Sequence, residues 1–348
     1  MGDSNSTIDQ EGLRRVAEKP TAAVPHSLFE YPLPLGETTD YITPSESLFV
    51  LAHLSVPRIE KSDWKLDIAG LVRTPLSLRY EQLRRYSERT ISTIHQCAGN
   101  PLEPTVPTRT IANVDWEGVL LRDILLDVGV RESCTHMWAF GSDFGSLEIG
   151  SYVSDIQEHY VKDLPIESVM AADVIVATRL NGEPLSEKHG YPARLVVPGY
   201  YGHNSVKWLC RLELANRRAE GLFTTQLYND PDPPTGGTKP VWHIEPESII
   251  VSPKEGSKLA RSVVEISGWA WSFTEIKAVE ISTDGGATWI QARLDPRKKM
   301  SWQRFRYKWR VPKPGHFQLI SRATDRDGKS QPLDSARNSV HKVKVAIQ

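Results

Sequence analysis

The residue best suited to chemistry is Cys97, which lies within residues 94–100, IHQCAGN. An apolar stretch that should form a strand precedes it, and two small residues and a turn-former follow. The sulfur atom is therefore expected at the end of a strand, with so little side-chain bulk beside it that the backbone could approach a large ligand. A lone cysteine is more often a small buried hydrophobic residue, so this motif by itself leaves both interpretations open.

Basic residues and histidines recur in separate turns further along the chain, where they could surround an anion. Arg194 could hold a phosphate group with its bidentate guanidinium, and Lys207 could do so with a compact charge. Arg194 could instead be a surface ion-pair partner. Asp143 could be a turn residue, and Tyr160 could be a packed aromatic whose hydroxyl group is already hydrogen-bonded.

The segment that carries these residues predicts a mixture of helix and strands. Apolar residues recur at helical spacing from 120 to 128, and Gly129 closes the run. The β-branched run 174–177 predicts a strand, and the Asn181-Gly182 pair predicts the turn of a hairpin. These elements favour an α+β class for the first part of the chain.

The last third of the chain has a different pattern. Prolines and glycines cluster between residues 228 and 238, which predicts a linker. Beyond it the elements are typical of short strands separated by turns, and about seven of them fit an antiparallel β-sandwich. These strands are expected at 263–268, 279–282, 288–290, 308–311, 317–320 and 340–347.

The composition is that of an ordinary globular protein. Among 348 residues, 39% are hydrophobic and 24% are charged, and the net charge of −1 gives no electrostatic reason to bind nucleic acid or a membrane surface. Three cysteines, an odd number, argue against a disulfide framework and fit a reducing compartment. No apolar run reaches the ~18 residues of a membrane span. The polar N-terminus contains no recognisable export signal, so we expect a cytoplasmic protein.

Several segments resemble the sulfite oxidase family of molybdenum-cofactor oxidoreductases, in the same order and with similar spacing. The segment around Cys97 resembles the cysteine signature of that family, and the likeness extends over residues 45 to 347. The other segments that carry it are 48–53 (LFVLAH), 140–143 (FGSD), 160–166 (YVKDLPI), 181–185 (NGEPL), 189–199 (HGYPARLVVPG), 202–209 (GHNSVKWL), 268–271 (GWAW) and 282–289 (STDGGATW).

The resemblance implies a fold class and a division into domains. It implies an α+β protein, in which a mixed α/β molybdopterin-binding domain of sulfite oxidase type is followed by an immunoglobulin-like β-sandwich. We predict an extended lead-in at 1–40, the molybdopterin-binding domain at 41–227, a Pro/Gly-rich linker at 228–242 and the β-sandwich at 243–348. By resemblance the sandwich is a dimerisation domain, so a homodimer is expected.

The resemblance also implies a molybdenum–molybdopterin cofactor and the residues that hold it. Cys97 would be the thiolate that binds the metal, and Tyr160 would hydrogen-bond to an oxo group or the substrate and take part in proton transfer. Cys134 and Cys210 match no ligand position and are expected to be structural. The residues implied to contact the cofactor are His53, Asn100, Asp143, His189, Arg194, Ser205 and Lys207.

The chain departs from the family pattern where sulfite oxidases carry arginines for their dianionic substrate. At those positions it has Leu51, the Pro101-Leu102 pair and Asn204. Each missing cation removes charge-assisted hydrogen bonds worth ~1.5–3 kcal/mol. We therefore predict a small neutral or organic sulfur or nitrogen substrate, such as a thioether, sulfoxide, sulfinate, N-oxide or thiocarbonyl compound.

Two other functions stay open at this point. Cations at other positions, from Arg109, His203 or Arg337, could make the chain a sulfite oxidase or dehydrogenase after all. From a different class, it could be a non-catalytic binding protein that kept the cofactor fold. If it is an enzyme, we expect electrons to pass to an external acceptor or to dioxygen, because the sequence has no CxxCH haem attachment motif and no recognisable haem or flavin module.

Overall fold

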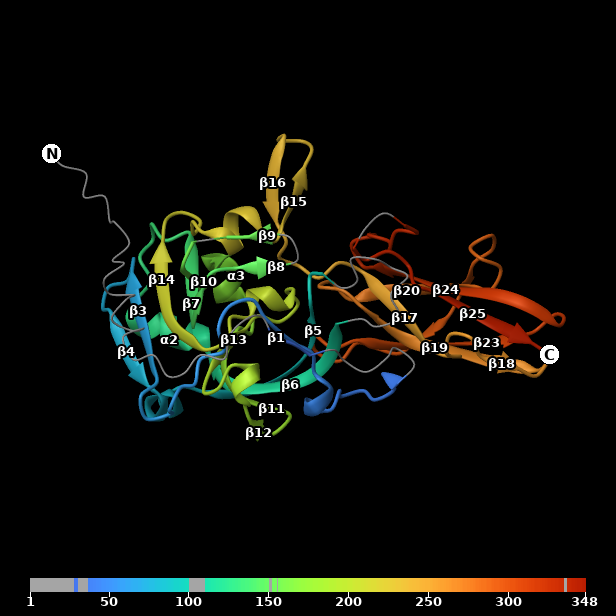
Figure 1. The fold of residues 1–348 in the computed structure, drawn as a ribbon, viewed down its shortest axis with the longest axis horizontal. Coiled ribbons are helices and arrows are strands. Elements are labelled where there is room, and N and C mark those ends of the chain that lie inside the picture. The colour runs from blue at the N-terminus through green and yellow to red at the C-terminus, as the bar shows by residue number, and fades with distance from the viewer. Residues whose placement is uncertain (1–27, 31–36, 100–109, 150–151, 155, 335–336) are drawn as a thin grey trace.

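The chain folds into two domains that follow one another along the long axis of the molecule (Figure 1). The computed structural model describes residues 28–30, 37–99, 110–149, 152–154, 156–334 and 337–348. The first domain runs from blue to yellow in Figure 1, and the second, from orange to red, consists of strands.

Two β-sheets form the framework of the first domain. In the first sheet β14 and β3 are parallel, and the other neighbours are antiparallel. Its strands, in spatial order, are β10 (Glu158–Pro165), β7 (His136–Gly145), β14 (Leu209–Ala215), β3 (Lys65–Gly70) and β4 (Leu76–Arg79). The strands of the second sheet are β12 (Glu183–Pro184), β11 (Ile175–Leu180), β6 (Ile111–Leu120) and β5 (Glu88–Gln96), and β13 (Arg194–Val196) also pairs with β11.

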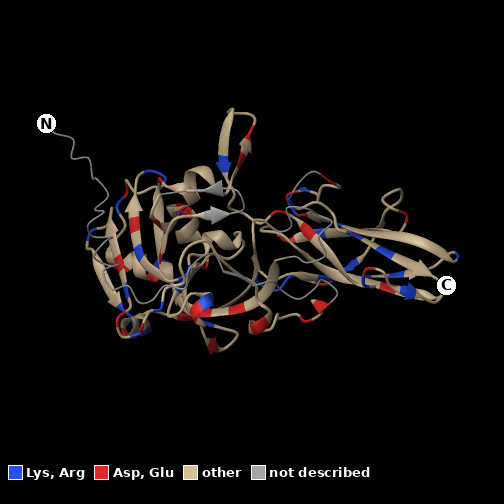
Figure 2. Cartoon of the chain, viewed as in Figure 1, with Lys and Arg blue, Asp and Glu red and all other residues tan. Residues whose placement is uncertain are grey.

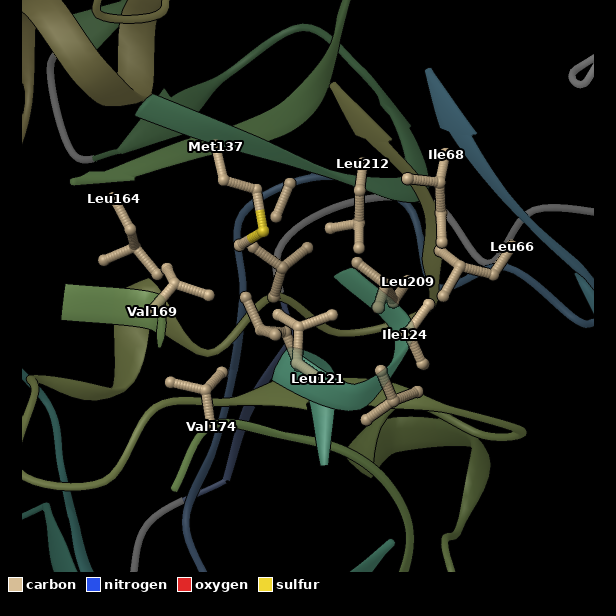
Figure 3. Close-up of a cluster of buried hydrophobic side chains, with 14 of the residues drawn as sticks. Leu66, Ile68, Leu121, Ile124, Met137, Leu164, Val169, Val174, Leu209 and Leu212 are labelled. Atoms are coloured by element: carbon tan, nitrogen blue, oxygen red, sulfur yellow. The ribbon is translucent and has the colours of Figure 1, made fainter. Parts of the chain in front are cut away.

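The predicted helix is confirmed as α2 (Leu121–Val128), which follows β6 directly. It ends at Gly129, whose left-handed φ of 66° breaks the helix with little strain because glycine has no Cβ. In Figure 3, Leu121 and Ile124 of α2 lie in one cluster with Leu209 and Leu212 of β14. The apolar face of α2 therefore packs against the first sheet and forms the main core of this domain.

The predicted strand and hairpin turn are confirmed as well. β11 is joined to β12 by Asn181 and Gly182, whose φ values of 49° and 86° are both left-handed. Two such residues in succession define the turn that matches the twist of a two-residue hairpin, and Asn-Gly is its preferred pair. Residues 28–30 of the predicted lead-in form β1 (Leu28–Glu30), which pairs with β2 (Val50–Ala52).

Shorter elements lie between and beside the strands of the two sheets. They are the hairpin of β8 (Glu148–Ile149) and β9 (Tyr152–Val153), helix α3 (Ile166–Ala171), the 3-10 helices η2 (Ser45–Ser47), η3 (Tyr80–Arg85), η4 (Glu187–His189) and η5 (Gly202–Asn204), and the π-helical turn η6 (Leu222–Gln226).

The second domain is the β-sandwich that the sequence predicts, although it has nine strands rather than about seven. Its two sheets enclose an apolar core that includes Ile266, Phe305 and Leu319. One sheet consists of β17 (Glu247–Ser252), β19 (Val263–Trp271), β23 (Gln303–Arg310) and β22 (Arg293–Leu294). The other consists of β18 (Lys258–Leu259), β25 (Lys342–Ile347), β24 (Gly315–Asp325), β20 (Ile276–Ser282) and β21 (Ile290–Gln291).

The segment predicted as a linker, 228–242, folds instead as a projecting hairpin of β15 (Asn229–Asp232) and β16 (Gly237–Pro240) (Figure 1). The amides of Thr235 and Gly236 both donate to the carbonyl of Asp232 and close its tip. Proline and glycine are typical of tight turns as well as of linkers, and here the turn explains their clustering.

Figure 2 shows acidic and basic residues interspersed over both domains, in keeping with the net charge of −1. None of the helices in the described part of the chain is long and apolar enough to traverse a bilayer.

Candidate functional site

A cavity of about 640 Å³, its open mouth included, lies in the first domain beside the end of β5. Segments far apart in the sequence meet around it: β2, the ends of β5 and β7, strand β10 and the turns near 189 and 205. The residues that line it are Phe49, Val50, Leu51, Ala52, His53, His95, Cys97, Asp143, Tyr160, Lys188, His189, Arg194, Gly202, His203, Ser205, Lys207 and Tyr228.

Cys97 follows the last residue of β5, as the sequence predicts. Side chains alternate between the two faces of a strand, and accordingly His95 and Cys97 both line the cavity. The amide of Gly99 donates to Cys97 Sγ at 3.4 Å. Burial raises the pKa of the Cys97 thiol. A bound metal cation would reverse this effect, since it favours the thiolate.

Two buried cations lie on one side of the cavity. Arg194 donates to the carbonyls of His189, at 3.1 Å, and Ser205, at 2.9 Å, and Lys207 Nζ donates to the carbonyl of Leu51 at 2.8 Å. Burial lowers the pKa of Arg194 to about 9, so its guanidinium stays protonated at neutral pH. Burial and the charge of Arg194 lower the pKa of Lys207 to about 7.

A glycine allows these two cations to come close together. Gly190 has a φ of +102°, and a Cβ placed there would lie 3.1 Å from Lys207 Cβ and 3.2 Å from Arg194 Cβ. Any larger residue would therefore be strained in its backbone and would push the two cationic side chains apart. The glycine of the HGYPAR segment fits this close approach.

Two histidines of the cavity are neutral hydrogen-bonding groups. Burial lowers the pKa of His53 to about 4 and that of His189 to about 3, and neighbouring cations lower both further in the same direction. The Nδ1 atom of His189 lies 2.9 Å from Ser186 Oγ, and Nε2 of His53 lies 2.5 Å from the Tyr228 hydroxyl. Each ring is thereby fixed in orientation.

Six buried polar atoms of the cavity lining make no hydrogen bond within the described residues: His53 Nδ1, Asp143 Oδ1, His189 Nε2, Arg194 Nε and both ring nitrogens of His203. Burial also raises the pKa of Asp143 to about 7. Unpaired buried polar groups are rare because they cost free energy, so such a group requires a partner. A cationic cradle with further unpaired donors and acceptors fits a phosphorylated, heteroaromatic ligand such as molybdopterin.

The two tyrosines of the cavity differ from the sequence-based prediction. Tyr160 lines the cavity, but its hydroxyl donates to the carbonyl of His203 at 2.7 Å, and its ring packs on Phe223. This is the simpler interpretation that the sequence left open. Tyr228, which the sequence analysis placed in a linker, directs its hydroxyl to His53 instead.

Eight of the nine residues predicted to form the site line this one cavity, and Asn100 lies outside the described residues. Ser205 is buried, and its Oγ accepts from the amide of Val197 at 3.1 Å. His95 and Tyr228 were missed. The spacing of two residues from Cys97 could have identified His95, whereas no signal in the sequence points to Tyr228.

The two other cysteines are buried away from the cavity lining. Cys134 Sγ donates to the carbonyl of His136 and Cys210 Sγ to that of Phe140, both at 3.4 Å. In the parts of the chain that the structure covers, no three His, Cys, Asp or Glu side chains gather to hold a metal ion. Cys97 would therefore be the one described protein ligand of a metal here, and the cofactor would have to bring further ligands of its own.

Of the positions where the family pattern has an arginine and this chain does not, Leu51 and Asn204 are described, whereas Pro101 and Leu102 lie outside the described residues. Leu51 lines the cavity with its apolar side chain, whereas the amide of Asn204 donates to the carbonyl of Tyr201. His203 stacks on the ring of Tyr228 at 4.0 Å, and burial lowers its pKa well below the usual value, so it is uncharged. Arg109 lies outside the described residues.

Arg337, from the second domain, approaches the same region. Its Nη2 contacts Asp230 Oδ1 of the hairpin at 2.5 Å, and its guanidinium lies 5.7 Å from the centre of the Tyr201 ring. Its Nη1 is buried and has no hydrogen bond within the described residues. Its positive charge lowers the pKa of Cys97, although burial has the larger and opposite effect.

Two family models match the chain: an oxidoreductase molybdopterin binding domain over residues 53–223 and a Mo-co oxidoreductase dimerisation domain over residues 238–346. The mitochondrial sulfite oxidase of Rattus norvegicus is 28% identical over 94% of this chain and 63% of its own length, so the chain spans less than two thirds of that relative. The sulfite oxidase of Gallus gallus is 28% identical over 92% of this chain and 73% of its own.

A solved structure agrees with these matches. The sulfane dehydrogenase SoxCD of Paracoccus pantotrophus has a TM-score of 0.78 and 28% identity, and the match covers 98% of this chain and 92% of that chain. Twelve of the seventeen residues that line the cavity lie within the range of the first family model, and residues 49–52 and Tyr228 lie outside it.

Proposed function

Because the chain belongs to the sulfite oxidase family of molybdopterin-dependent oxidoreductases, we propose that it catalyses a two-electron oxygen-atom transfer on a neutral or organic sulfur or nitrogen compound. The observation that carries the proposal is the composition of the cavity. Its two buried cations, Arg194 and Lys207, lie together, whereas residues 49–52 on β2 and before it are apolar.

The residues present fit the cofactor of this family. Bound molybdopterin supplies a metal that exchanges two electrons and an oxygen atom with the substrate. Cys97 would bind that metal through a thiolate, a soft donor suited to it. Arg194 and Lys207 would hold the phosphate group, the neutral His53 and His189 would donate hydrogen bonds, and Asp143 would accept one.

Tyr228 and His53 would hold the proton that such a reaction exchanges. Burial raises the pKa of Tyr228, so its hydroxyl keeps its proton at all physiological pH values. It contacts Nε2 of the neutral His53 at 2.5 Å. A hydroxyl group bonded to an imidazole ring can pass a proton to that ring or take one from it, and on this geometry the pair is our candidate for holding the proton. Tyr160 lacks this freedom, because its hydroxyl proton is directed to a backbone carbonyl.

The charges around the cavity favour a substrate that is not a dianion. His203 is uncharged, the charge of Arg337 is balanced by Asp230, and Leu51 is apolar. A doubly charged anion would gain few charge-assisted hydrogen bonds there, whereas a neutral sulfur compound would bury its apolar surface. The sulfane dehydrogenase among the relatives acts, by its name, on a sulfur compound other than sulfite.

Oxidation of sulfite is the second candidate, and one specific observation favours it. Nη1 of Arg337 is buried and makes no hydrogen bond with any described residue, so it could bind an anion that reaches it. Several relatives are named sulfite oxidases. We further propose that the sandwich forms a homodimer, as the name of its family model suggests, and that an external acceptor or dioxygen receives the electrons. A cytoplasmic location stays a prediction.

Metal analysis and turnover test these proposals together. The purified protein should contain about one molybdenum per chain and should oxidise or reduce a thioether, sulfoxide or N-oxide with an artificial redox partner. Cys97→Ser should lower turnover by at least ~1000-fold, because a hard, poorly ionised hydroxyl replaces a soft thiolate. Cys210→Ser, a buried cysteine outside the cavity lining, is the control. Sulfite turnover at micromolar KM would establish the second candidate, and protein without molybdenum would leave only a non-catalytic binding function.

A further inference from the structure

β5, the strand that ends directly before Cys97, lies at one edge of its sheet. The spatial order β12-β11-β6-β5 places β5 last, so one side of its backbone has no partner strand in the first domain. The sandwich supplies the missing contacts. The amide of Ile94 donates to the carbonyl of Met300 at 3.2 Å, and Lys299 Nζ donates to the carbonyl of Thr90 at 3.0 Å. β5 is therefore held from both sides, once by each domain.

The side chains of β5 divide between the two domains. His95 and Cys97 point to the cavity, and the alternation of a strand turns Ile94 and Gln96 the other way. Ile94 packs in a cluster with three tryptophans of the sandwich, Trp269, Trp271 and Trp302. One face of the end of β5 lines the cavity, and the opposite face packs against the second domain.

Gln96, the residue next to Cys97, has no exposed surface and is bound at both ends of its carboxamide by the sandwich. Its Nε2 donates to Glu247 Oε2 at 2.5 Å, and its Oε1 accepts from Trp271 Nε1 at 2.8 Å. Glu247 and Trp271 are direct partners in the antiparallel pair of β17 and β19. Two cross-strand neighbours therefore both form hydrogen bonds with the side chain of Gln96.

We propose that the β-sandwich domain positions Cys97 for metal binding by holding Gln96 between Glu247 and Trp271. This inference rests on the proposed function, because it assumes that Cys97 is the metal ligand. Consecutive Cα atoms are fixed ~3.8 Å apart, so a shift of Gln96 moves the sulfur atom with it. Glu247 and Trp271 act through Gln96 and do not line the cavity, which makes them positioning residues.

The buried carboxylate of Glu247 strengthens its hydrogen bond with Gln96. Replacing either partner therefore tests the proposal. An amide that donates to a carboxylate forms a charge-assisted hydrogen bond, which is about twice as strong as a neutral one. Glu247 is fully buried, so bulk solvent cannot reach its carboxylate and take the place of Gln96 as a hydrogen-bond donor. Loss of the carboxamide would leave a buried charged group without this partner, and the end of β5 would shift to compensate.

A matched pair of variants tests the proposal. Trp271→Phe removes the donor to Gln96, and Trp269→Phe removes an equivalent donor, two residues away on the same strand, which bonds to the carbonyl of Thr38. Both should lower the melting temperature to a similar extent. In cofactor-free protein, iodoacetamide should modify Cys97 about fivefold faster in Trp271→Phe than in Trp269→Phe, the factor expected from loss of one neutral hydrogen bond. Mass spectrometry of the Cys97 peptide reports the rate.

A charge swap adds a rescue test. Gln96→Glu places two buried carboxylates against each other and should strongly lower molybdenum content and stability. Combined with Glu247→Gln, one carboxamide again faces one carboxylate, with the direction of their hydrogen bond reversed and Trp271 still donating to residue 96, so both quantities should recover. The electron paramagnetic resonance spectrum of the partly reduced metal centre should shift in Trp271→Phe and remain unchanged in Trp269→Phe, because it is sensitive to the orientation of the sulfur ligand.

Equal alkylation rates in the two tryptophan variants, within a factor of about two, would overturn the proposal, since less than ~0.4 kcal/mol would then separate them. An unrecovered double variant would do so as well. The alkylation rates require no cofactor. A protein without molybdenum would refute the proposed function and leave the comparison of Trp271→Phe with Trp269→Phe valid as a test of how the strand end is held.

Discussion

The cavity has two walls of opposite character. The cationic wall, Arg194 and Lys207, consists of buried charges held by backbone carbonyls. The apolar wall, residues 49–52, is formed by a short strand that presents aliphatic and aromatic side chains. The walls meet where Lys207 donates to the carbonyl of Leu51.

The difference between the walls indicates how the cavity would distinguish a charged ligand from a neutral one. A buried cation is costly unless it has partners, so the chain places charge only where carbonyls and a bound anion can stabilise it. On the apolar wall no such carbonyl cradle is needed, and none of the residues 49–52 is charged. Under the proposed function, the cofactor would be recognised by its charge, and the substrate by its lack of charge.

The largest expected effect on cofactor binding comes from a substitution in the cationic wall. Arg194→Lys removes the planar guanidinium that bonds two carbonyls and still has Nε without a partner in the described chain. Lysine cannot satisfy two carbonyls and a phosphate in one plane, so two charge-assisted hydrogen bonds are lost, about 3 kcal/mol or ~100-fold in cofactor affinity. Molybdenum per chain, measured after dialysis, should fall accordingly. Arg211→Lys, in an ion pair on β14, is the control and should retain full occupancy.

The next effect concerns the apolar wall. Leu51→Arg places a cation beside Lys207 and the cavity, where a dianion could use it. The inhibition constant or KM of sulfite should decrease by ~10–100-fold, the value of one or two charge-assisted hydrogen bonds. Turnover of a neutral substrate should fall at the same time. Leu51→Met keeps the apolar character, and an equal response of both variants to sulfite would contradict the assignment of this wall.

Much of this arrangement could be predicted from the sequence, for identifiable physical reasons. The helix 121–128 follows from its apolar periodicity and its terminal glycine, and the 181–182 turn follows from the φ values that Asn and Gly tolerate. Cys97 follows from a strand that ends in small residues. In each case the determining interactions lie within a few residues of each other.

The features that the sequence did not indicate are those that distant segments decide. The prolines near 231 fit a linker and a hairpin equally well locally, and only the pairing of β15 with β16 selects the hairpin. Tyr160 is buried and Tyr228 is half-buried, and they differ in whether the hydroxyl group bonds to a backbone carbonyl or to His53. The contact of Gln96 with Glu247 joins residues 151 positions apart. Local patterns carry no information on such pairs.

A third expected effect concerns how the stability of the folded protein depends on pH. The folded protein holds the pKa of His53 near 4, by burial and by the charge of Lys207, whereas the unfolded chain has an ordinary histidine. Between pH 6.5 and 4 the unfolded state therefore binds a proton that the folded state does not, so stability falls as pH falls. At pH 5 this amounts to ~2 kcal/mol.

Cofactor-free His53→Gln should accordingly lose about 2 kcal/mol less than the parent protein between pH 7 and pH 5, as measured by urea unfolding. The comparison uses the difference between two pH values, so any general destabilisation by the substitution cancels. His316→Gln, an exposed histidine of β24, should follow the parent protein. An unchanged slope in His53→Gln would mean that neither burial nor the charge of Lys207 suppresses protonation of this ring.

The smallest expected effect concerns the one cation that reaches the cavity region from the sandwich. Asp230→Asn removes the carboxylate that pairs with Arg337, and the freed guanidinium can then attract an anion on the side of the cavity near Cys97. The side chains of Arg337 and Asp230 are 25% and 42% exposed, so water weakens their interaction. Sulfite should bind about two- to fivefold more tightly, equivalent to ~0.5–1 kcal/mol. Asp232→Asn alters the same hairpin strand without touching Arg337 and is the control. In an Arg337→Gln background the effect of Asp230→Asn should vanish. If it persists there, the carboxylate acts by direct repulsion of the anion, and the charge balance between the two domains has no part in substrate choice.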